Sequence, residues 1–305
     1  MKGIVLAGGR GTRLHPVTKA VSKQLLPVYD KPLVYYPLSV LMLAGIDEVL
    51  VISTSDDQPL FERLLGDGSD LGMQFAYAAQ DEPRGLPDAF RLGRGFLDGS
   101  PACLVLGDNI FHGHGLSALL QAEADAFRKP ADAELELGLD GPGCTLFGFA
   151  VADPERYGVA EVDGSGRIVA IEEKPPAPRS NLAITGLYMY DSTVSDRADE
   201  LRPSARGELE ITDLNMSYVS EGRARLVQLG RGMAWLDAGT HDSLLEAATF
   251  VQVLEHRQGE QIACLEEVAY RMGWIDADQL AALADRLGQS RYGESLRRLA
   301  GRPPR

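Results

Sequence analysis

The chain has few cysteines, and they are spread too widely to act together. Cys103, Cys144 and Cys264 are the only three among 305 residues, and none belongs to a closely spaced pair. An odd number of isolated cysteines excludes a disulfide framework and argues against a structural zinc site. This usage is typical of a reducing compartment, and we therefore expect a cytoplasmic protein.

Long apolar runs are also missing. The first apolar stretch, at 4–7, ends on Gly8 and Gly9 and is shorter than the apolar region of a signal peptide. A membrane-spanning helix needs about 20 predominantly apolar residues, and no segment approaches that length. We predict that the chain has no membrane segment and does not act at a membrane.

Positive charge is scarce overall, because the net charge is −14. Nucleic-acid-binding proteins usually present a basic face, so no nucleic-acid partner is expected. The first 31 residues differ from the rest, since Asp30 is their only acid. The basic residues of this segment are Lys2, Arg10, Arg13, Lys19, Lys23 and Lys31. This concentration of cations favours an anion site, although a solvated basic surface has the same composition.

Apolar patterns in the first half alternate between strands and helices. Strands are predicted at 4–7, 48–53, 73–79 and 102–106, and helices at 33–44, 59–65, 87–97 and 116–127. This order predicts an α/β fold, a Rossmann-like three-layer sandwich with a mostly parallel central sheet. Ligands of such sheets bind beyond the carboxyl ends of the strands. Gly8, Gly9 and Asp108 follow two predicted strands, so we expect them to line one crevice.

The second half changes character twice. A β-rich insertion is predicted, with strands at 145–151, 159–162, 168–172, 183–190 and 224–229, a turn at 163–166 and a helix at 210–221. From 241 onward the pattern is helical, with Gly259 ending one helix and Asp276 or Asp278 capping another. The polar stretch at 128–143 is predicted to be an irregular surface excursion.

The first strand is followed by a glycine-rich loop. Glycines at this position let backbone N–H groups approach phosphate oxygens, because no Cβ intervenes. Arg13 adds a guanidinium suited to phosphate. The loop is neither a Walker loop nor G-x-G-x-x-G, since Leu14 occupies the last position of the latter pattern. Taken alone, it fits a structural tight turn equally well.

The residues after this loop carry a resemblance to a known family. The pattern G-x-G-T-R-L-x-P-x-T at 9–18, then Lys23, then P-V-x-x-K-P at 27–32, resembles the signature of sugar-1-phosphate nucleotidyltransferases. The string KQLLPVYDKPLVYYPLS at 23–39 is similar to their glucose-1-phosphate thymidylyltransferase branch. Further similar segments lie at 106–111, 153–159, 172–175, 183–190, 206–213 and 235–242. The resemblance covers nearly the whole chain.

The resemblance implies a reaction between dTTP and glucose 1-phosphate, with Mg²⁺ as cofactor. A sugar-phosphate oxygen would attack the α-phosphorus and release pyrophosphate, which requires charge neutralisation and in-line positioning. The matching catalytic positions are Arg13, Lys23 and Lys174, and the matching metal carboxylates are Asp108 and Asp237. The matching nucleotide contacts are Leu6, Gly8, Gly9, Gly11, Thr12, Gln80, Gly85 and Asp108. The matching sugar contacts are Asn109, Tyr157, Gly158, Glu173, Lys174 and Ile184.

The resemblance also implies a domain division and an assembly. We expect a catalytic domain at 1–240, with its sugar-binding part at about 145–235, and a helical extension at 241–305 that makes oligomer contacts. Members of this branch are typically homotetramers with a feedback site near subunit interfaces. His112 stands where the family leads us to expect tyrosine, and we predict no metal site at His112 and His114.

Three segments depart from the expected pattern. The excursion at 128–143 is longer, the segment 80–88 carries more charges, and Leu182 replaces an aromatic residue beside the sugar site. Individually, Asp108 also fits a turn and Asp237 a helix cap. A uridylyltransferase acting on a sugar 1-phosphate and a non-catalytic regulatory subunit that binds nucleotide sugars remain the alternatives.

Overall fold

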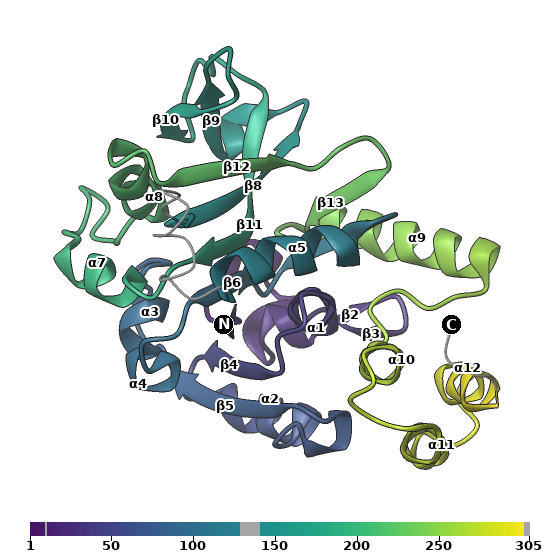
Figure 1. Ribbon diagram of the computed structural model, residues 1–305. Coiled ribbons are helices and arrows are strands. Elements are labelled where there is room, and N and C mark those ends of the chain that lie inside the picture. The colour runs from purple at the N-terminus through teal and green to yellow at the C-terminus, as the bar shows by residue number, and fades with distance from the viewer. Residues whose placement is uncertain (10, 129–140, 302–305) are drawn as a thin grey trace.

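The computed structural model describes residues 1–9, 11–128 and 141–301, and it shows a three-layer α/β sandwich (Figure 1). A nine-stranded sheet runs in the order β10-β9-β11-β6-β1-β4-β5, β8 also pairs with β11, and β12 pairs with β8. The parallel part contains β1 (Lys2–Leu6), β4 (Glu48–Ser53), β5 (Gln74–Ala79) and β6 (Ala102–Leu106). The remaining strands are β8 (Cys144–Ala150), β9 (Gly158–Val162), β10 (Ile168–Glu173), β11 (Leu182–Tyr190) and β12 (Ala224–Gln228).

Both faces of the parallel strands are buried. Successive side chains of a strand point to opposite faces, and β1 accordingly sends Val5 into one core and Ile4 and Leu6 into the other. Continuous apolar runs such as VLVIS and ACLVL are therefore what these strands require. The predicted α/β class and mostly parallel central sheet are confirmed, and β11 begins the antiparallel extension by pairing with β6.

Helices cover the two faces of the sheet (Figure 1). One face packs against α1 (Tyr35–Leu43), α2 (Gln58–Leu65), α5 (Leu116–Arg128) and α10 (Leu265–Arg271). The other packs against α3 (Asp88–Leu92), α4 (Arg94–Leu97), α7 (Val194–Glu200) and α8 (Ile211–Ser220). The helix predicted at 87–97 is thus two helices. They break at Gly93, which packs so closely on the sheet that a Cβ there would lie 3.2 Å from Ile4 Cδ1.

Two small ribbons were not predicted. The hairpin of β2 (Pro27–Val28) and β3 (Lys31–Pro32) follows the N-terminal loop, and β7 (Asn109–Gly113) pairs with β13 (Met233–Asp237). The second ribbon joins segments that are far apart in the sequence, and neither segment has a strand pattern that identifies its partner. The three-residue helices at Thr12–Leu14, Val17–Lys19 and Lys23–Leu25 shape the loop after β1.

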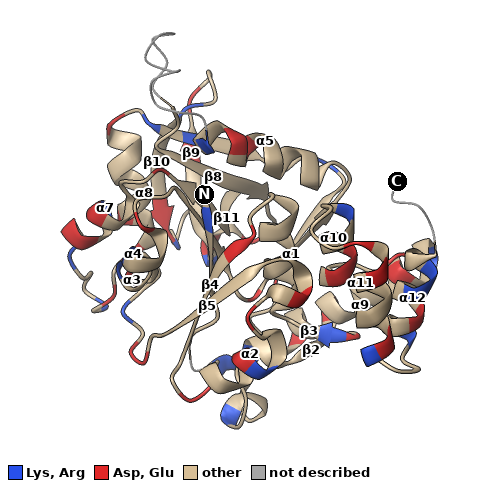
Figure 2. Ribbon diagram, turned by 60° about the horizontal axis from the view of Figure 1, so that its bottom comes forward, with Lys and Arg blue, Asp and Glu red and all other residues tan. Residues whose placement is uncertain are grey.

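The helical tail is confirmed from 241 onward. It contains α9 (His241–Gln258), α11 (Ala277–Arg286) and α12 (Arg291–Ala300) besides α10. Thr240 caps α9, Gly259 ends it with φ 71°, and Asp276 rather than Asp278 caps α11. Acidic and basic residues occur along these tail helices (Figure 2). Across the described ranges, none of the helices combines the length and apolar character needed to span a membrane.

One buried lysine ties the tail to the β2–β3 hairpin. The Lys31 side chain is only 1% exposed and forms ion pairs with Asp30 and, at 3.0 Å, with Glu255 of α9. Its ammonium also lies 5.7 Å from the ring centres of Tyr36 and Tyr292, where cation–π attraction adds to the ion pairs. Glu255 further accepts a hydrogen bond from Ile262 N, which fixes the chain after α9.

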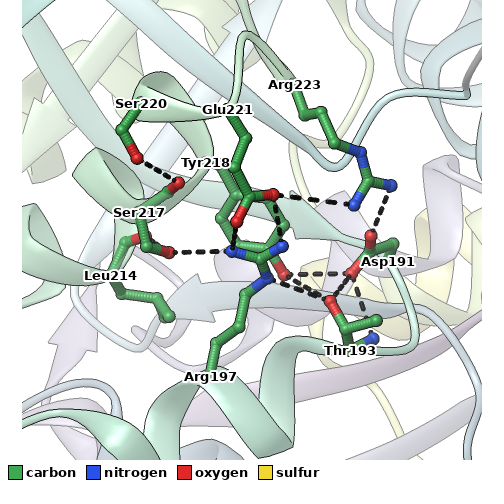
Figure 3. A network of polar contacts seen from close by, with 9 residues as sticks. All are labelled: Asp191, Thr193, Arg197, Leu214, Ser217, Tyr218, Ser220, Glu221 and Arg223. Atoms are coloured by element: carbon green, nitrogen blue, oxygen red, sulfur yellow. Dashed lines mark hydrogen bonds and ion pairs between the residues drawn. The ribbon is translucent and has the colours of Figure 1, made fainter.

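A polar network joins α7, α8 and the turn that leads into β12 (Figure 3). The Arg197 guanidinium lies 4.1 Å from the Tyr218 ring centre and donates to both carboxylate oxygens of Glu221. Asp191 accepts hydrogen bonds from Tyr218 and Arg223. The backbone carbonyl of Arg223 accepts from Gly143 N, so the network anchors the chain where β8 begins. Most of the predicted excursion, 129–140, lies outside the described residues.

Candidate active site

Four parallel strands end side by side, and the residues that follow them form one row. In sheet order these are Asp108 after β6, Gly8 and Gly9 after β1, Thr54 after β4 and Gln80 after β5. The backbone supports the row, because Gly107 N donates to Leu6 O and Gln80 N donates to Ser53 O. The expected crevice is present at the carboxyl edge of the sheet.

Asp108 is held by two side chains. Lys23 Nζ donates to Asp108 Oδ2, and Asn109 Nδ2 donates to Oδ1 at 2.9 Å. Burial opposes ionisation of the carboxyl group, but the Lys23 ammonium and the Asn109 amide outweigh it and lower the pKa of Asp108. The carboxylate is therefore kept charged and is already matched by a cation in this structure.

Asp237 reaches the same place through the β7–β13 ribbon. It pairs with Asn109 across the ribbon, and Ala238 N donates to Asp108 O at 3.0 Å. Burial and the neighbouring Asp108 carboxylate both raise the pKa of Asp237. Two carboxylates that repel one another, with opposite pKa shifts, leave a local need for positive charge.

A pocket of about 220 Å³ contains both carboxylates and the cations of the N-terminal loop. We call it the carboxylate pocket. Its lining residues are Gly11, Thr12, Arg13, Lys23, Asp108, Asp237 and Gly239. Gly239 leaves room for Asp237, because a Cβ there would lie 3.0 Å from Asp237 Oδ1. Apart from Gly11 and Gly239, the lining consists of five residues that the sequence had already assigned to the site, and the structure brings them together in one cavity.

A second pocket of about 530 Å³, here named the long pocket, adjoins the first at Thr12. Its lining residues include Leu6, Gly8, Gly9, Gln80, Gly85 and Leu86 and the charged residues Glu173, Lys174, Arg206, Glu208 and Glu210. Gly85 has φ 100° and bridges to Leu209, and a Cβ there would fall on the Leu209 backbone, within 2.7 Å of its nitrogen. Only glycine fits this wall without displacing the chain.

Two charged residues of the long pocket, Glu173 and Lys174, lie at the end of β10 and directly after it. Glu173 pairs with Gly158, and its carboxylate accepts from Thr212 Oγ1 at 3.0 Å and lies 3.1 Å from Lys174 Nζ. Lys174 has φ 47°, a left-handed conformation that non-glycine residues rarely adopt, and its backbone nitrogen donates to Tyr157 O. Strained backbone of this kind is common where a side chain must be aimed at a ligand.

Four predicted sugar contacts lie beside these pockets instead of lining them, within the residues that the structure describes. They are Asn109, Tyr157, Gly158 and Ile184. The Asn109 amide is engaged, because Oδ1 accepts from Gly186 N at 3.1 Å and from Trp235 Nε1 at 2.6 Å. The Tyr157 ring packs against the Trp235 ring at 5.0 Å. Asn109 and Gly158 pair with the lining residues Asp237 and Glu173 across their ribbons.

Comparison with known proteins identifies the family of the chain. A family model described as nucleotidyl transferase matches residues 2–253. A glucose-1-phosphate thymidylyltransferase of Xanthomonas campestris is 57% identical over 301 residues, covering 99% of this chain and 97% of the relative. The chain belongs to the glucose-1-phosphate thymidylyltransferase family. Proteins of the same name from Neisseria meningitidis and Mycobacterium tuberculosis are 52% and 49% identical, over 98% and 99% of this chain and 99% and 100% of theirs.

Solved structures agree with this membership. A Bacillus anthracis protein assigned as a glucose-1-phosphate thymidylyltransferase, in complex with a sucrose, superimposes with a TM-score of 0.71 at 37% identity. The match covers 82% of this chain and 94% of that one. A UDP-glucose pyrophosphorylase with UDP-glucose shares the fold, with a TM-score of 0.68 at 24% identity over 83% and 98% of the two chains.

Three residues of this family member were not assigned roles from sequence. Arg206 and Glu210 line the long pocket, and Arg206 donates to both oxygens of Glu210 while Ser204 Oγ donates to one. Hydrogen bonds from Ser204 and Arg206 outweigh burial and lower the pKa of Glu210. The sequence signal for this pair is the spacing, because Arg206 precedes Glu210 by four residues. Trp235 had none, because its contact with Asn109 depends on the unpredicted ribbon.

Proposed function

We infer that the chain forms dTDP-glucose and pyrophosphate from dTTP and glucose 1-phosphate. The observation that carries this inference is identity of about half or more, over almost the whole length, with relatives named for that enzyme. The cavities agree with it, because a two-carboxylate pocket and a larger pocket lined by both apolar and charged residues share Thr12 of the glycine-rich loop.

We propose that the nucleotide lies along the row of strand ends. The base occupies the end of the long pocket with Leu6, Gln80 and Gly85, and the phosphates follow the loop from Gly8 to Thr12. Arg13 and Lys23 neutralise the phosphate charge. The glucose phosphate binds at the end with Lys174 and Arg206, and the sugar ring faces Glu173 and the wall of Asn109, Tyr157, Gly158 and Ile184.

The proposed chemistry is a single displacement. A phosphate oxygen of glucose 1-phosphate forms a bond to the α-phosphorus of dTTP, and the bond from that phosphorus to the bridging oxygen of the β-phosphate breaks. Pyrophosphate leaves with the electron pair, so no covalent enzyme intermediate is needed. Arg13, Lys23 and Lys174 hold the two anionic substrates together and stabilise the charge that accumulates in the transition state.

We propose that Asp108 and Asp237 hold Mg²⁺. The residues present fit this ion, because it prefers oxygen ligands and commonly takes one or two carboxylates together with substrate phosphates. The Lys23 ammonium on Asp108 and the raised pKa of Asp237 support this assignment, because both are expected where two carboxylates attract positive charge. When bound, the ion would neutralise phosphate oxygens and draw charge from the α-phosphorus.

We propose that the tail from 241 contributes to a homo-oligomer in the cytoplasm. On α9, Leu245 and Val253 are 68% and 51% exposed. Most of their apolar surface is therefore not used in packing within the chain. A second copy of the chain would cover them. Sedimentation of the purified protein, compared with that of Leu245→Lys, tests this assignment.

The main proposal is tested by pyrophosphate release with each nucleoside triphosphate, crossed against several sugar 1-phosphates, with and without Mg²⁺. We expect turnover of dTTP with glucose 1-phosphate that requires the metal. Turnover of UTP with the same sugar at higher kcat/KM would favour a uridylyltransferase, and nucleotide-sugar binding without turnover would favour a regulatory subunit.

A further inference from the structure

Gln80 in the long pocket has one partner that decides how its amide is oriented. Gln80 ends the row after β5, and its Nε2 donates to Asp88 Oδ2 at 2.8 Å. Asp88 is the first residue of α3 and is only 4% exposed. Among the described residues, Asp88 is the only side chain with a hydrogen bond to the Gln80 amide. The segment that contains both residues was noted from sequence for its unusual charge.

The chemistry of a carboxylate leaves one orientation for this amide. A carboxylate has no proton to donate, so it can only accept. The NH₂ group of Gln80 must therefore face Asp88, and the amide oxygen must point away from it. The structure has this arrangement, because Gln80 Oε1 would lie 3.5 Å from a Cβ placed on Gly8. Gly8 lines the same pocket as Gln80, so Oε1 is the acceptor on that side.

We propose that Asp88 is a positioning residue that makes Gln80 a fixed acceptor for the N3–H group of a pyrimidine base. This rests on the proposed function, which places the base at Gln80. Thymine and uracil carry a proton on N3 and can donate it to Oε1. Cytosine has an unprotonated N3, so two acceptors would face each other without a proton between them.

The arrangement gives discrimination that an unconstrained glutamine would not give. A glutamine with a neutral neighbour can rotate its amide by half a turn and offer NH₂ or oxygen as the base requires. Asp88 removes that freedom, because rotation would bring the amide oxygen against its carboxylate. A site built around one hydrogen-bond pattern rejects the mismatched ligand strongly, since buried polar groups are left unpaired. The contact accounts for rejection of cytosine and is neutral between thymine and uracil.

The test compares dTTP, dUTP and dCTP in wild type and Asp88→Asn, with saturating glucose 1-phosphate and Mg²⁺. Asparagine has the same shape but can turn its NH₂ toward Gln80, which frees Gln80 Nε2 to donate to cytosine N3. We expect wild type to prefer dTTP over dCTP by at least about 100-fold in kcat/KM. In Asp88→Asn that ratio should fall at least tenfold, chiefly through a lower KM for dCTP, and dTTP and dUTP should change together.

Glu123→Gln is the matched control. Glu123 is another buried carboxylate, 8% exposed, that pairs with Arg225 and accepts from Thr145 Oγ1 far from either pocket. It should lose thermal stability without altering the dTTP to dCTP ratio. General damage to the fold lowers kcat/KM for all three nucleotides equally, whereas a changed ratio reports the orientation of Gln80.

Two results would overturn the proposal. One is a wild-type enzyme that uses dCTP as well as dTTP, and the other is an Asp88→Asn variant that keeps the wild-type ratio. If Asp88→Asn does not fold, N3-methyl-dTTP decides the matter in wild type, because full activity with this analogue contradicts donation from N3. Absence of any turnover of dTTP with glucose 1-phosphate would instead refute the proposed function.

Discussion

Asp237 lies directly across the β7–β13 ribbon from Asn109, and this pairing brings it to Asp108, which follows the end of β6 by two residues. The register of the ribbon thus places two carboxylates on one cavity, although Asp108 and Asp237 come from distant parts of the chain. The environment of the two is unequal, because Lys23 offsets the charge of Asp108, whereas burial and the repulsion from Asp108 outweigh the attraction of Lys23, Arg156 and Arg13 at Asp237. Several testable consequences depend on this asymmetry.

Asp108→Asn should abolish most activity and leave the fold intact. The carboxamide cannot replace the charge that the pocket offers to a metal and to the phosphates, so kcat/KM should fall by about 100-fold or more. The melting temperature should fall while unfolding stays cooperative, since the lost ion pair joins side chains that are only 14% and 21% exposed. Wild-type turnover in this variant would contradict the assigned role of Asp108.

Asp237→Asn should behave differently in the absence of metal. A carboxyl group whose pKa is raised by folding destabilises the native state at pH values above that raised pKa, and the cost declines as the pH falls below it and is gone below the ordinary pKa of the unfolded chain. At neutral pH, removing the charge should therefore raise the melting temperature of the metal-free protein, by about 2 °C for each kcal/mol recovered. Calorimetry in chelator measures this, and activity assays should show a loss as large as that of Asp108→Asn.

The Mg²⁺ requirement should depend on pH through Asp237. The ion must displace the proton held by this carboxyl group, and the raised pKa keeps the proton bound at higher pH than an ordinary aspartate would. As the pH is lowered from neutral, the Mg²⁺ concentration needed for half-maximal activity should rise. This rise should begin at a higher pH than any loss of activity measured at saturating Mg²⁺. Titrations of Mg²⁺ over a pH series measure the effect, and a requirement independent of pH would argue against Asp237 as a ligand.

Arg206→Ala should weaken binding of the sugar phosphate specifically. Glu210 orients the Arg206 guanidinium in the lining of the long pocket. A charged hydrogen bond from Arg206 to the sugar phosphate would contribute about 1.5–3 kcal/mol to binding. The KM for glucose 1-phosphate should rise about 10- to 100-fold, with the KM for dTTP nearly unchanged. Glu210→Gln should give a smaller effect in the same direction, because Arg206 remains but loses its bidentate partner.

Gly85→Ala should destabilise the wall at the base end. The positive φ of 100° and the backbone of Leu209 both exclude a Cβ, and strain of this kind costs about 1–3 kcal/mol before any clash is counted. Gly99→Ala is the matched control, since Gly99 has φ 71° but nothing within 4 Å of a Cβ. The variant at Gly85 should unfold at a lower temperature than the control and should bind dTTP more weakly.

The sequence allowed the parts of the site that follow strands to be predicted, and the reason is geometric. Buried parallel strands have a recognisable apolar pattern, and their carboxyl ends meet along one edge, so Gly8 and Asp108 could be brought together without a structure. The resemblance then supplied Lys23 and Asp237. Contacts that depend on pairing between remote segments, such as Trp235 with Asn109 or Asp88 with Gln80, have no local signature. The same holds for the break at Gly93, which reflects how closely the helix approaches the sheet.

The helical tail stabilises the part of the chain around the buried Lys31, although the tail follows every pocket-lining residue in the sequence. Glu255 supplies a counter-ion to this lysine, and Tyr292 covers it with an aromatic face. A chain ending at 240 would keep every residue of both pockets but would expose one flank of the hairpin that follows Lys23 and leave Asp30 as the partner of the ammonium. The tail therefore stabilises the β2–β3 hairpin, and the residues that line the pockets and those that support this hairpin belong to different parts of the chain.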